Sequence, residues 1–136
     1  MEISENNFYI TNKQIFSSIN TLSDSIVSKS FDFAYDMTFG EKGKHRNHRS
    51  GGQYKRSRPE LFINTLQGKL AEYSIYDYFL NNKFKLDEPD LSTWDLGLWD
   101  SVDIIINDKK INVKSTKHFG NLILYETKDW NMDGSY

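Results

Sequence analysis

Asp103 and Lys114 are the residues of this chain whose types and spacing most clearly suggest chemistry. Each lies beside apolar residues that alternate with polar ones, a pattern typical of a β-strand with one buried face. A carboxylate can bind a hard divalent cation through oxygen, and a nearby amine can orient a water molecule and balance the charge of a phosphate. If both side chains lie on one face, the pair has the groups that metal-assisted phosphodiester hydrolysis needs.

A tight β-hairpin over residues 101–116 is the element that would position this pair. A two-residue turn at Asn107-Asp108 places Ile104 opposite Ile111 and gives the hairpin one aliphatic face. The opposite face then carries the carboxylate and the amine. The alternation of side chains therefore predicts both the register of the hairpin and the placement of its polar groups.

The turn also decides how close the two polar side chains come. With the turn at Asn107-Asp108, Asp103 faces Asn112 and Lys114 is its diagonal neighbour. With the turn moved to Asp108-Lys109, Asp103 and Lys114 are direct partners about 5 Å apart. A three-residue turn would scramble both faces, so we disfavour it. The plain alternative is a surface ion pair without chemistry, which contributes ~0–1 kcal/mol.

Glu72 supplies a second carboxylate, on a predicted helix. Ser57-Arg58-Pro59-Glu60 has the form of a capping box with proline in the first turn, so the helix should begin near Pro59. It should run to Leu80 and end at Asn81-Asn82. The apolar side chains near one face of this helix are Phe62, Leu66, Leu70, Tyr73 and Tyr76. Taken alone, Glu72 fits a solvent-facing helix position equally well.

The remaining segments are less regular. Thr11-Asn12 fits the cap of a first helix that runs to about Lys29. Residues 31–39 are rich in aromatic side chains and fit a strand or a helix. Residues 83–100 are expected to be irregular or to contain short strands, and Leu122-Ile123-Leu124-Tyr125 to form a further strand.

The order of the helix glutamate, the strand aspartate and the lysine resembles the PD-(D/E)XK nuclease superfamily. This group includes many type II restriction endonucleases, Holliday-junction resolvases and repair nucleases. The matching residues are Gln67-Gly68-Lys69-Leu70-Ala71-Glu72, Val102-Asp103-Ile104 and Asn112-Val113-Lys114. The resemblance covers roughly residues 59–126 through short motifs. It implies an α/β (α+β) fold, with a restriction-endonuclease-like core in which a helix packs on a small mixed sheet.

On this resemblance, residues 1–136 form one nuclease-like domain with an N-terminal helical region over 1–40, a basic arm over 41–58 and a catalytic-type core over 59–126. The superfamily's core usually continues after the lysine strand with a helix and another strand, whereas only about 20 residues follow Thr116 here. Three explanations stay open. The chain is an N-terminal fragment of a longer protein, or a partner completes the fold, or the N-terminal helix takes the missing role.

The activity that the resemblance implies is Mg²⁺-dependent DNA endonuclease activity, with Mn²⁺ as the alternative metal. Asp103, Glu72 and Asn112 would hold the metal, and Lys114 would assist the attacking water. A nuclease of the Holliday-junction-resolvase type is an alternative within the same superfamily. Because most type II enzymes act as dimers, a homodimer is the oligomer that the resemblance suggests.

Asn112 departs from the superfamily's pattern, which has Asp or Glu at this position. Its neutral carbonyl oxygen is a weaker ligand for Mg²⁺ than a carboxylate. Another acid could supply the missing ligand, with Glu72 the first candidate and Glu126 the second, or the site has a weaker metal affinity. The third alternative is an inactive chain, natural or engineered, which would serve as a nucleic-acid-binding module of the same fold.

Within the basic arm, residues 42–58 contain seven cations and no acid: Lys42, Lys44, Arg46, Arg49, Lys55, Arg56 and Arg58. Their charge of +7 leaves −9 on the remainder of a chain whose net charge is −2. A phosphate backbone would relieve the repulsion among these cations, so we expect the arm to bind DNA with a steep salt dependence. A solvated loop is the alternative. Lys117, just after the lysine strand, is a further candidate for phosphate contact.

The composition of the chain argues against disulfide frameworks, thiolate or zinc sites, and membrane spans. A chain of 136 residues without cysteine is expected to form one domain without a disulfide framework or thiolate metal site, and three histidines are too few for a zinc site. No apolar run approaches the roughly 20 residues of a membrane span, and the start lacks the features of a signal peptide. We therefore expect a cytoplasmic protein without a membrane partner. A protein-interaction or inhibitor domain that uses the acidic remainder stays open as a third class.

Overall fold

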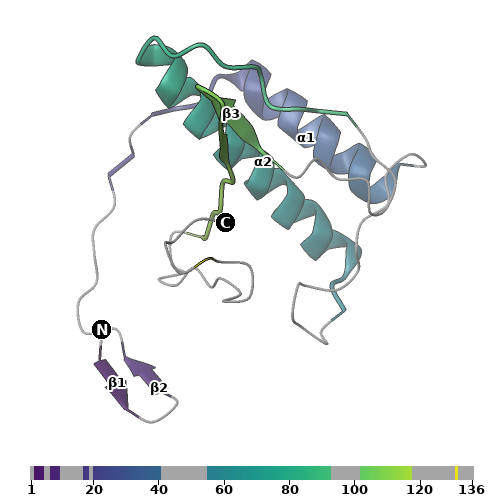
Figure 1. Ribbon diagram of the computed structural model, residues 1–136. Coiled ribbons are helices and arrows are strands. Elements are labelled where there is room, and N and C mark those ends of the chain that lie inside the picture. Colours follow the sequence, from purple (N-terminus) through teal and green to yellow (C-terminus); the bar gives the residue numbers. More distant parts are fainter. Residues whose placement is uncertain are drawn as a thin grey trace. The chain divides into compact units, whose positions relative to one another are not determined.

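The computed structural model describes residues 2–4, 7–9, 17–18, 20–40, 55–92, 102–117 and 131. In chain order its elements are β1 (Glu2–Ser4), β2 (Asn7–Tyr9), α1 (Asp24–Phe39), α2 (Arg58–Asn81), β3 (Ile104–Ile106) and β4 (Lys109–Ile111) (Figure 1). The fold therefore belongs to the mixed α+β class. The chain divides into two compact units, one of Met1–Ile19 with Thr116–Tyr136 and one of Asn20–Ser115. No described helix has the length and apolarity needed to cross a bilayer.

Helix α1 begins at a serine cap. The Ser23 side chain accepts a hydrogen bond from the Ile26 amide at 3.4 Å, which satisfies one of the free donors of the first turn. The predicted helix from Thr11-Asn12 to about Lys29 is wrong at both ends, because the described residues 17–18 and 20–23 are not helical and the helix continues past Lys29 to Phe39. The segment 31–39, which the sequence left undecided, is helical.

Helix α2 begins as the sequence predicts. The Ser57 side chain accepts from the Glu60 amide at 3.4 Å, and the Glu60 carboxylate accepts from the Ser57 amide at 2.8 Å. These two bonds complete the predicted capping box. The helix ends at Asn81, with Asn82 as its cap, so its predicted extent is confirmed to within a residue or two.

The two helices pack against each other in antiparallel directions. At one end, the side-chain amide of Asn20, before α1, donates to the Ser74 carbonyl of α2 at 3.2 Å. At the other end, the Phe39 and Phe62 rings lie 6.0 Å apart. The buried apolar side chains between and beside the helices are Phe33, Ala34, Met37, Leu61, Tyr73, Ile104 and Ile106.

The β3–β4 hairpin confirms the register predicted from the alternation of side chains. Ile104 pairs with Ile111, and the turn consists of Asn107 and Asp108. Both turn residues have positive φ, 48° and 63°, as a type I′ turn requires. Ile104 is buried and Ile105 is exposed, so the aliphatic face packs on the core. The alternative turn at Asp108-Lys109 is wrong.

A second hairpin, which the sequence did not predict, joins β1 and β2 in the other unit. The two strands are antiparallel, with Glu2 opposite Tyr9. Both sheets in the described part of the chain are thus two-stranded and antiparallel, and the small mixed sheet that the resemblance implies is not formed there. The strand predicted at Leu122-Ile123-Leu124-Tyr125, and Glu126 after it, lie outside the described residues.

Candidate functional site

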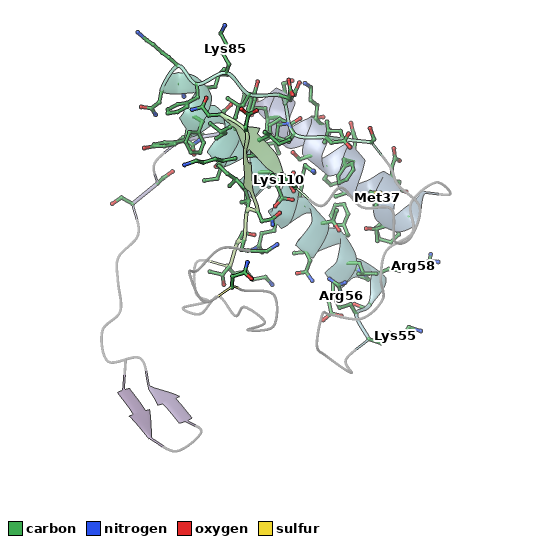
Figure 2. All side chains as sticks on the ribbon, viewed as in Figure 1. Met37, Lys55, Arg56, Arg58, Lys85 and Lys110 are labelled. Carbon is green, nitrogen blue, oxygen red and sulfur yellow. The ribbon has the colours of Figure 1, made fainter. Side chains whose placement is uncertain are left out.

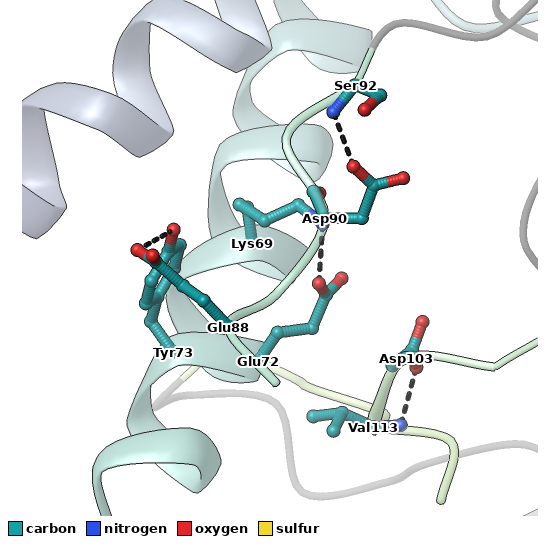
Figure 3. A network of polar contacts seen from close by, with 8 residues as sticks. All are labelled: Lys69, Glu72, Tyr73, Glu88, Asp90, Ser92, Asp103 and Val113. Atoms are coloured by element: carbon teal, nitrogen blue, oxygen red, sulfur yellow. Dashed lines mark hydrogen bonds and ion pairs between the residues drawn. The ribbon is translucent and has the colours of Figure 1, made fainter. Parts of the chain in front are cut away.

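Asp103 is fixed at the open end of the β3–β4 hairpin. Its side chain is half-buried, and its Oδ2 accepts a hydrogen bond from the Val113 amide at 2.6 Å (Figure 3). The strand ladder ends at the pair of Ile104 and Ile111. The carboxylate therefore replaces the next backbone partner and ties the two strands together beyond the ladder.

Glu72 lies in the middle of α2 with its carboxylate half-buried. Its Oε2 accepts from the Lys69 ammonium at 2.5 Å, one helical turn earlier. Burial raises the pKa of Glu72, the attraction of Lys69 opposes this rise, and the negative charges of Asp103 and Asp90 add to it. Asp103 of the hairpin is thus one of the charged groups that act on the pKa of Glu72, and Figure 3 shows both side chains on the same side of α2.

Two partly buried carboxylates from different elements therefore share one electrostatic environment. Like charges at close range disfavour joint ionisation unless a cation balances them. Magnesium ions in proteins are often held by only one or two carboxylates, with water and substrate phosphate completing the coordination. Among the described residues, no group of three acids or histidines is close enough to hold a metal ion together.

The segment from Asp87 to Ser92 closes one side of this environment. The Tyr73 hydroxyl donates to the Glu88 carboxylate at 2.9 Å, which holds the segment on α2. Two residues later, the Asp90 carbonyl accepts from the Lys69 ammonium at 2.8 Å. The Asp90 carboxylate itself accepts from the Ser92 amide at 2.8 Å in a local turn.

Lys114 is held in place by hydrogen bonds of the residues on either side of it in the chain. Val113, before it, donates its amide to Asp103, and Ser115, after it, accepts a hydrogen bond from the Gln67 side chain at 3.2 Å. The Lys114 side chain is exposed, and in the described part of the chain no ion pair joins it to Asp103. Lys114 therefore follows directly after the residue that anchors Asp103, and its side chain is exposed.

Asn112 and Gly68 lie beside these groups. Asn112 is half-buried and follows β4 directly. Gly68 lies one turn before Glu72 on the same face of α2. No described atom is within 4 Å of the position that a Cβ on Gly68 would take. Within the described chain, the helix surface beside Glu72 is thus open at this point.

Three of the predicted DNA-binding residues gather at the N-terminal end of α2, where Figure 2 shows Lys55, Arg56 and Arg58. Lys55 and Arg58 are exposed, whereas Arg56 is half-buried. Arg58 lies about 20 Å from Glu72 along the helix axis. Lys117 is exposed in the other unit. The other four predicted residues, Lys42, Lys44, Arg46 and Arg49, lie outside the described residues.

Two residues of this environment have no role in the sequence prediction. Lys69 lies within the motif matched around Glu72, and Asp90 lies outside every matched motif. The spacing of Lys69 and Glu72, three residues apart on a helix, was a usable signal for an ion pair. Asp90 before Leu91-Ser92 had the form of an Asx turn, which predicts its local bond but not its carbonyl's contact with Lys69. That contact depends on tertiary packing, for which the sequence carries no local pattern.

Comparison of the chain with protein-family models, with curated proteins and with solved structures finds no match.

Proposed function

We propose that the chain is a Mg²⁺-dependent endonuclease that hydrolyses phosphodiester bonds in DNA, with a restriction-endonuclease-like core. The proposal rests on one observation above all. Asp103 of the hairpin and Glu72 of α2, 31 positions apart in the sequence, lie on the same side of α2 in Figure 3, and the charge of Asp103 contributes to the raised pKa of Glu72. The motif lysine follows directly after the residue whose amide anchors that aspartate.

The donor set suits a hard divalent cation. Both carboxylates offer oxygen, and each accepts a hydrogen bond from within the protein through one oxygen, Oδ2 in Asp103 and Oε2 in Glu72. The remaining oxygens, Asp103 Oδ1 and Glu72 Oε1, are then the candidate ligands, with the Asn112 carbonyl as a weaker third. A bound Mg²⁺ would balance charge on the scissile phosphate and lower the pKa of a coordinated water.

The protein's own residues would place the substrate. Lys114, exposed beside Asp103, would pair with the scissile phosphate and orient the attacking water. The open surface at Gly68 would let the DNA backbone approach α2 near Glu72. Lys55 and Arg58 would bind phosphates farther along the same strand, about 20 Å from Glu72 along α2. Water adds to phosphorus, and the bond from phosphorus to the leaving sugar oxygen breaks as that oxygen takes a proton.

Cleavage of supercoiled plasmid and of branched DNA by the purified full chain in Mg²⁺ or Mn²⁺ tests this proposal. Asp103→Asn should lower the rate roughly 100-fold or more, because it removes a charged ligand yet keeps an acceptor for the Val113 amide. Asn112→Asp should raise the rate at limiting Mg²⁺ by roughly tenfold, because it adds the acid that the superfamily's pattern has.

Asn107→Asp is the matched control, since it makes the same change of charge in the exposed turn at the far end of the hairpin. It should leave the rate within about twofold of the wild type. Intact plasmid and intact branched DNA with both the wild type and Asn112→Asp would contradict the proposal.

A catalytically silent DNA-binding module is the second candidate, and Asn112 is the observation that favours it. In that case Asn112→Asp brings no cleavage. DNA binding in a gel-shift assay would then be sensitive to salt, indifferent to divalent metal and unchanged by Asp103→Ala. A protein without any DNA affinity at low salt would exclude both candidates.

A further inference from the structure

Lys69 is a buried lysine at the centre of α2, and its ammonium has two polar partners and one aromatic partner. Only 9% of the residue is exposed. Its ammonium donates to the Glu72 carboxylate at 2.5 Å and to the Asp90 carbonyl at 2.8 Å. It also lies 4.9 Å from the centre of the Phe33 ring of α1. Three separate segments of the chain thus converge on one cation.

A buried ammonium is costly unless its charge is paired and its donors are used. The three partners meet this need, since a lysine has three donors and a cation is attracted to the face of an aromatic ring. A purely structural lysine would need the same contacts, so the contacts alone do not distinguish a role. The position of its carboxylate partner does.

Glu72 lies on the same side of α2 as Asp103 in Figure 3, and the charge of Asp103 raises the pKa of Glu72. The Lys69 ammonium occupies Oε2 of this carboxylate, while Oε1 takes no hydrogen bond from the described residues. Because Lys69 is itself held by the Asp90 carbonyl and the Phe33 ring, it limits the rotation of the Glu72 carboxylate.

We propose that Lys69 is a positioning residue: it fixes the Glu72 carboxylate through Oε2 so that Oε1 alone binds a divalent cation shared with Asp103. This inference rests on the proposed function and adds to it the ligand mode of Glu72 and the group that sets it. Outer groups that orient a metal ligand typically affect metal affinity by roughly 10–100-fold.

Two other roles of Lys69 would give different results in a metal-binding measurement. If the ammonium merely takes the place of the metal, its removal would free the carboxylate and remove a repelling charge, and metal binding would become tighter. If Lys69 only stabilises the fold, its removal would change the stability of the protein but not the metal affinity of the folded molecules.

Calorimetric titration of the full chain with Mn²⁺ alone separates these roles, with circular dichroism as the check of folding. Lys69→Met should raise the Kd for Mn²⁺ by roughly 10–100-fold. Lys29→Met is the matched control, because Lys29 forms a similar lysine–glutamate pair with Glu88 at 3.1 Å on the exposed surface. It should leave the Kd unchanged. An unchanged or lower Kd in Lys69→Met would overturn the inference.

Asp103→Asn in the same titration distinguishes this inference from the proposed function. If the wild type binds no Mn²⁺, or Asp103→Asn binds it as well as the wild type, the proposed metal site fails and the inference fails with it. If Asp103→Asn loses Mn²⁺ and Lys69→Met does not, only the role of Lys69 fails.

A second readout needs no variant and decides the matter even if Lys69→Met does not fold. In crystals of the wild type with Mn²⁺, Glu72 should bind the ion through one oxygen while Lys69 still donates to the other. A Glu72 carboxylate that binds through both oxygens, with Lys69 displaced, would overturn the inference.

Discussion

Glu72 has neighbours that act on its charge in opposite directions. Burial and the charges of Asp103 and Asp90 favour the neutral carboxyl group, whereas Lys69 favours the carboxylate. The net effect is a raised pKa, so the charged form of Glu72 is less stable in the folded protein than it would be in water. Such arrangements are common at functional sites, since a cation that binds there relieves the repulsion.

Glu88 is the opposite case among the described carboxylates, because hydrogen bonds from Tyr73 and Lys29 lower its pKa. Its contribution to stability is therefore present above pH 4.5, its ordinary pKa, and is lost as the pH falls through the lowered value. At pH 7, Glu88→Gln should lower the free energy of unfolding by about 1 kcal/mol or less, since the carboxylate is half exposed. Urea denaturation at pH 7, 5 and 3 measures this difference.

Asp87→Asn is the control for this series, because Asp87 is the exposed neighbour of Glu88. At pH 7 its effect on the free energy of unfolding should be smaller than that of Glu88→Gln. The account of Glu88 is wrong if Glu88→Gln differs from the wild type by as much at pH 3 as at pH 7.

At the scale of elements, α2 is the helix that carries the site, and both of its ends are closed by local bonds. At the C-terminal end, the Phe84 amide donates to the Phe79 carbonyl and the Lys83 amide to the Leu80 carbonyl, at 3.1 and 2.9 Å. The Phe79 and Phe84 rings lie 5.3 Å apart. These features form a Schellman motif with its usual apolar contact.

The motif places Lys83 at φ 65°, where glycine is the usual residue. An L-residue in this region costs about 1–2 kcal/mol, so Lys83→Gly should raise the free energy of unfolding by about 1 kcal/mol. Urea denaturation measures the effect. Lys85→Gly, two residues later and without a positive φ, is the control and should not stabilise the protein. Equal effects of the two substitutions would contradict the assignment of this motif.

Some elements could be predicted because their signals are local. The capping box of α2 is visible as a serine and a glutamate three residues apart, and the hairpin as an alternation around Asn107-Asp108. The start of α1 was predicted wrongly, because the helix begins after Ser23. Its buried residues run from Ser30 to Met37, and most helical stability in proteins comes from the packing of such a face, which local signals do not reveal.

The candidate site also contains features that the sequence predicts and features that it does not. Glu72, Asp103 and Lys114 could be singled out from their residue types and their order along the chain. The contacts of Lys69 with Asp90 and Phe33, and of Gln67 with Ser115, could not. These contacts join residues from separate segments whose approach depends on the packing of both helices and the hairpin.

At the scale of the whole molecule, the charge distribution fits a protein that binds a polyanion. The charge of +7 over residues 42–58 contrasts with −9 elsewhere in the chain. The described part of the basic arm is at the start of α2, whereas the paired carboxylates act at its middle. Basic residues away from the carboxylates would bind the DNA backbone without neutralising the acids that a metal ion needs.

The account depends on whether a divalent cation binds between helix α2 and the β3–β4 hairpin. Anomalous diffraction from crystals of the full chain soaked in MnCl₂ tests this directly. We predict one peak about 2.1 Å from an oxygen of Glu72 and from an oxygen of Asp103, which is lost in crystals of Asp103→Asn. Crystals that show no peak between these two carboxylates, with or without bound DNA, would contradict the account.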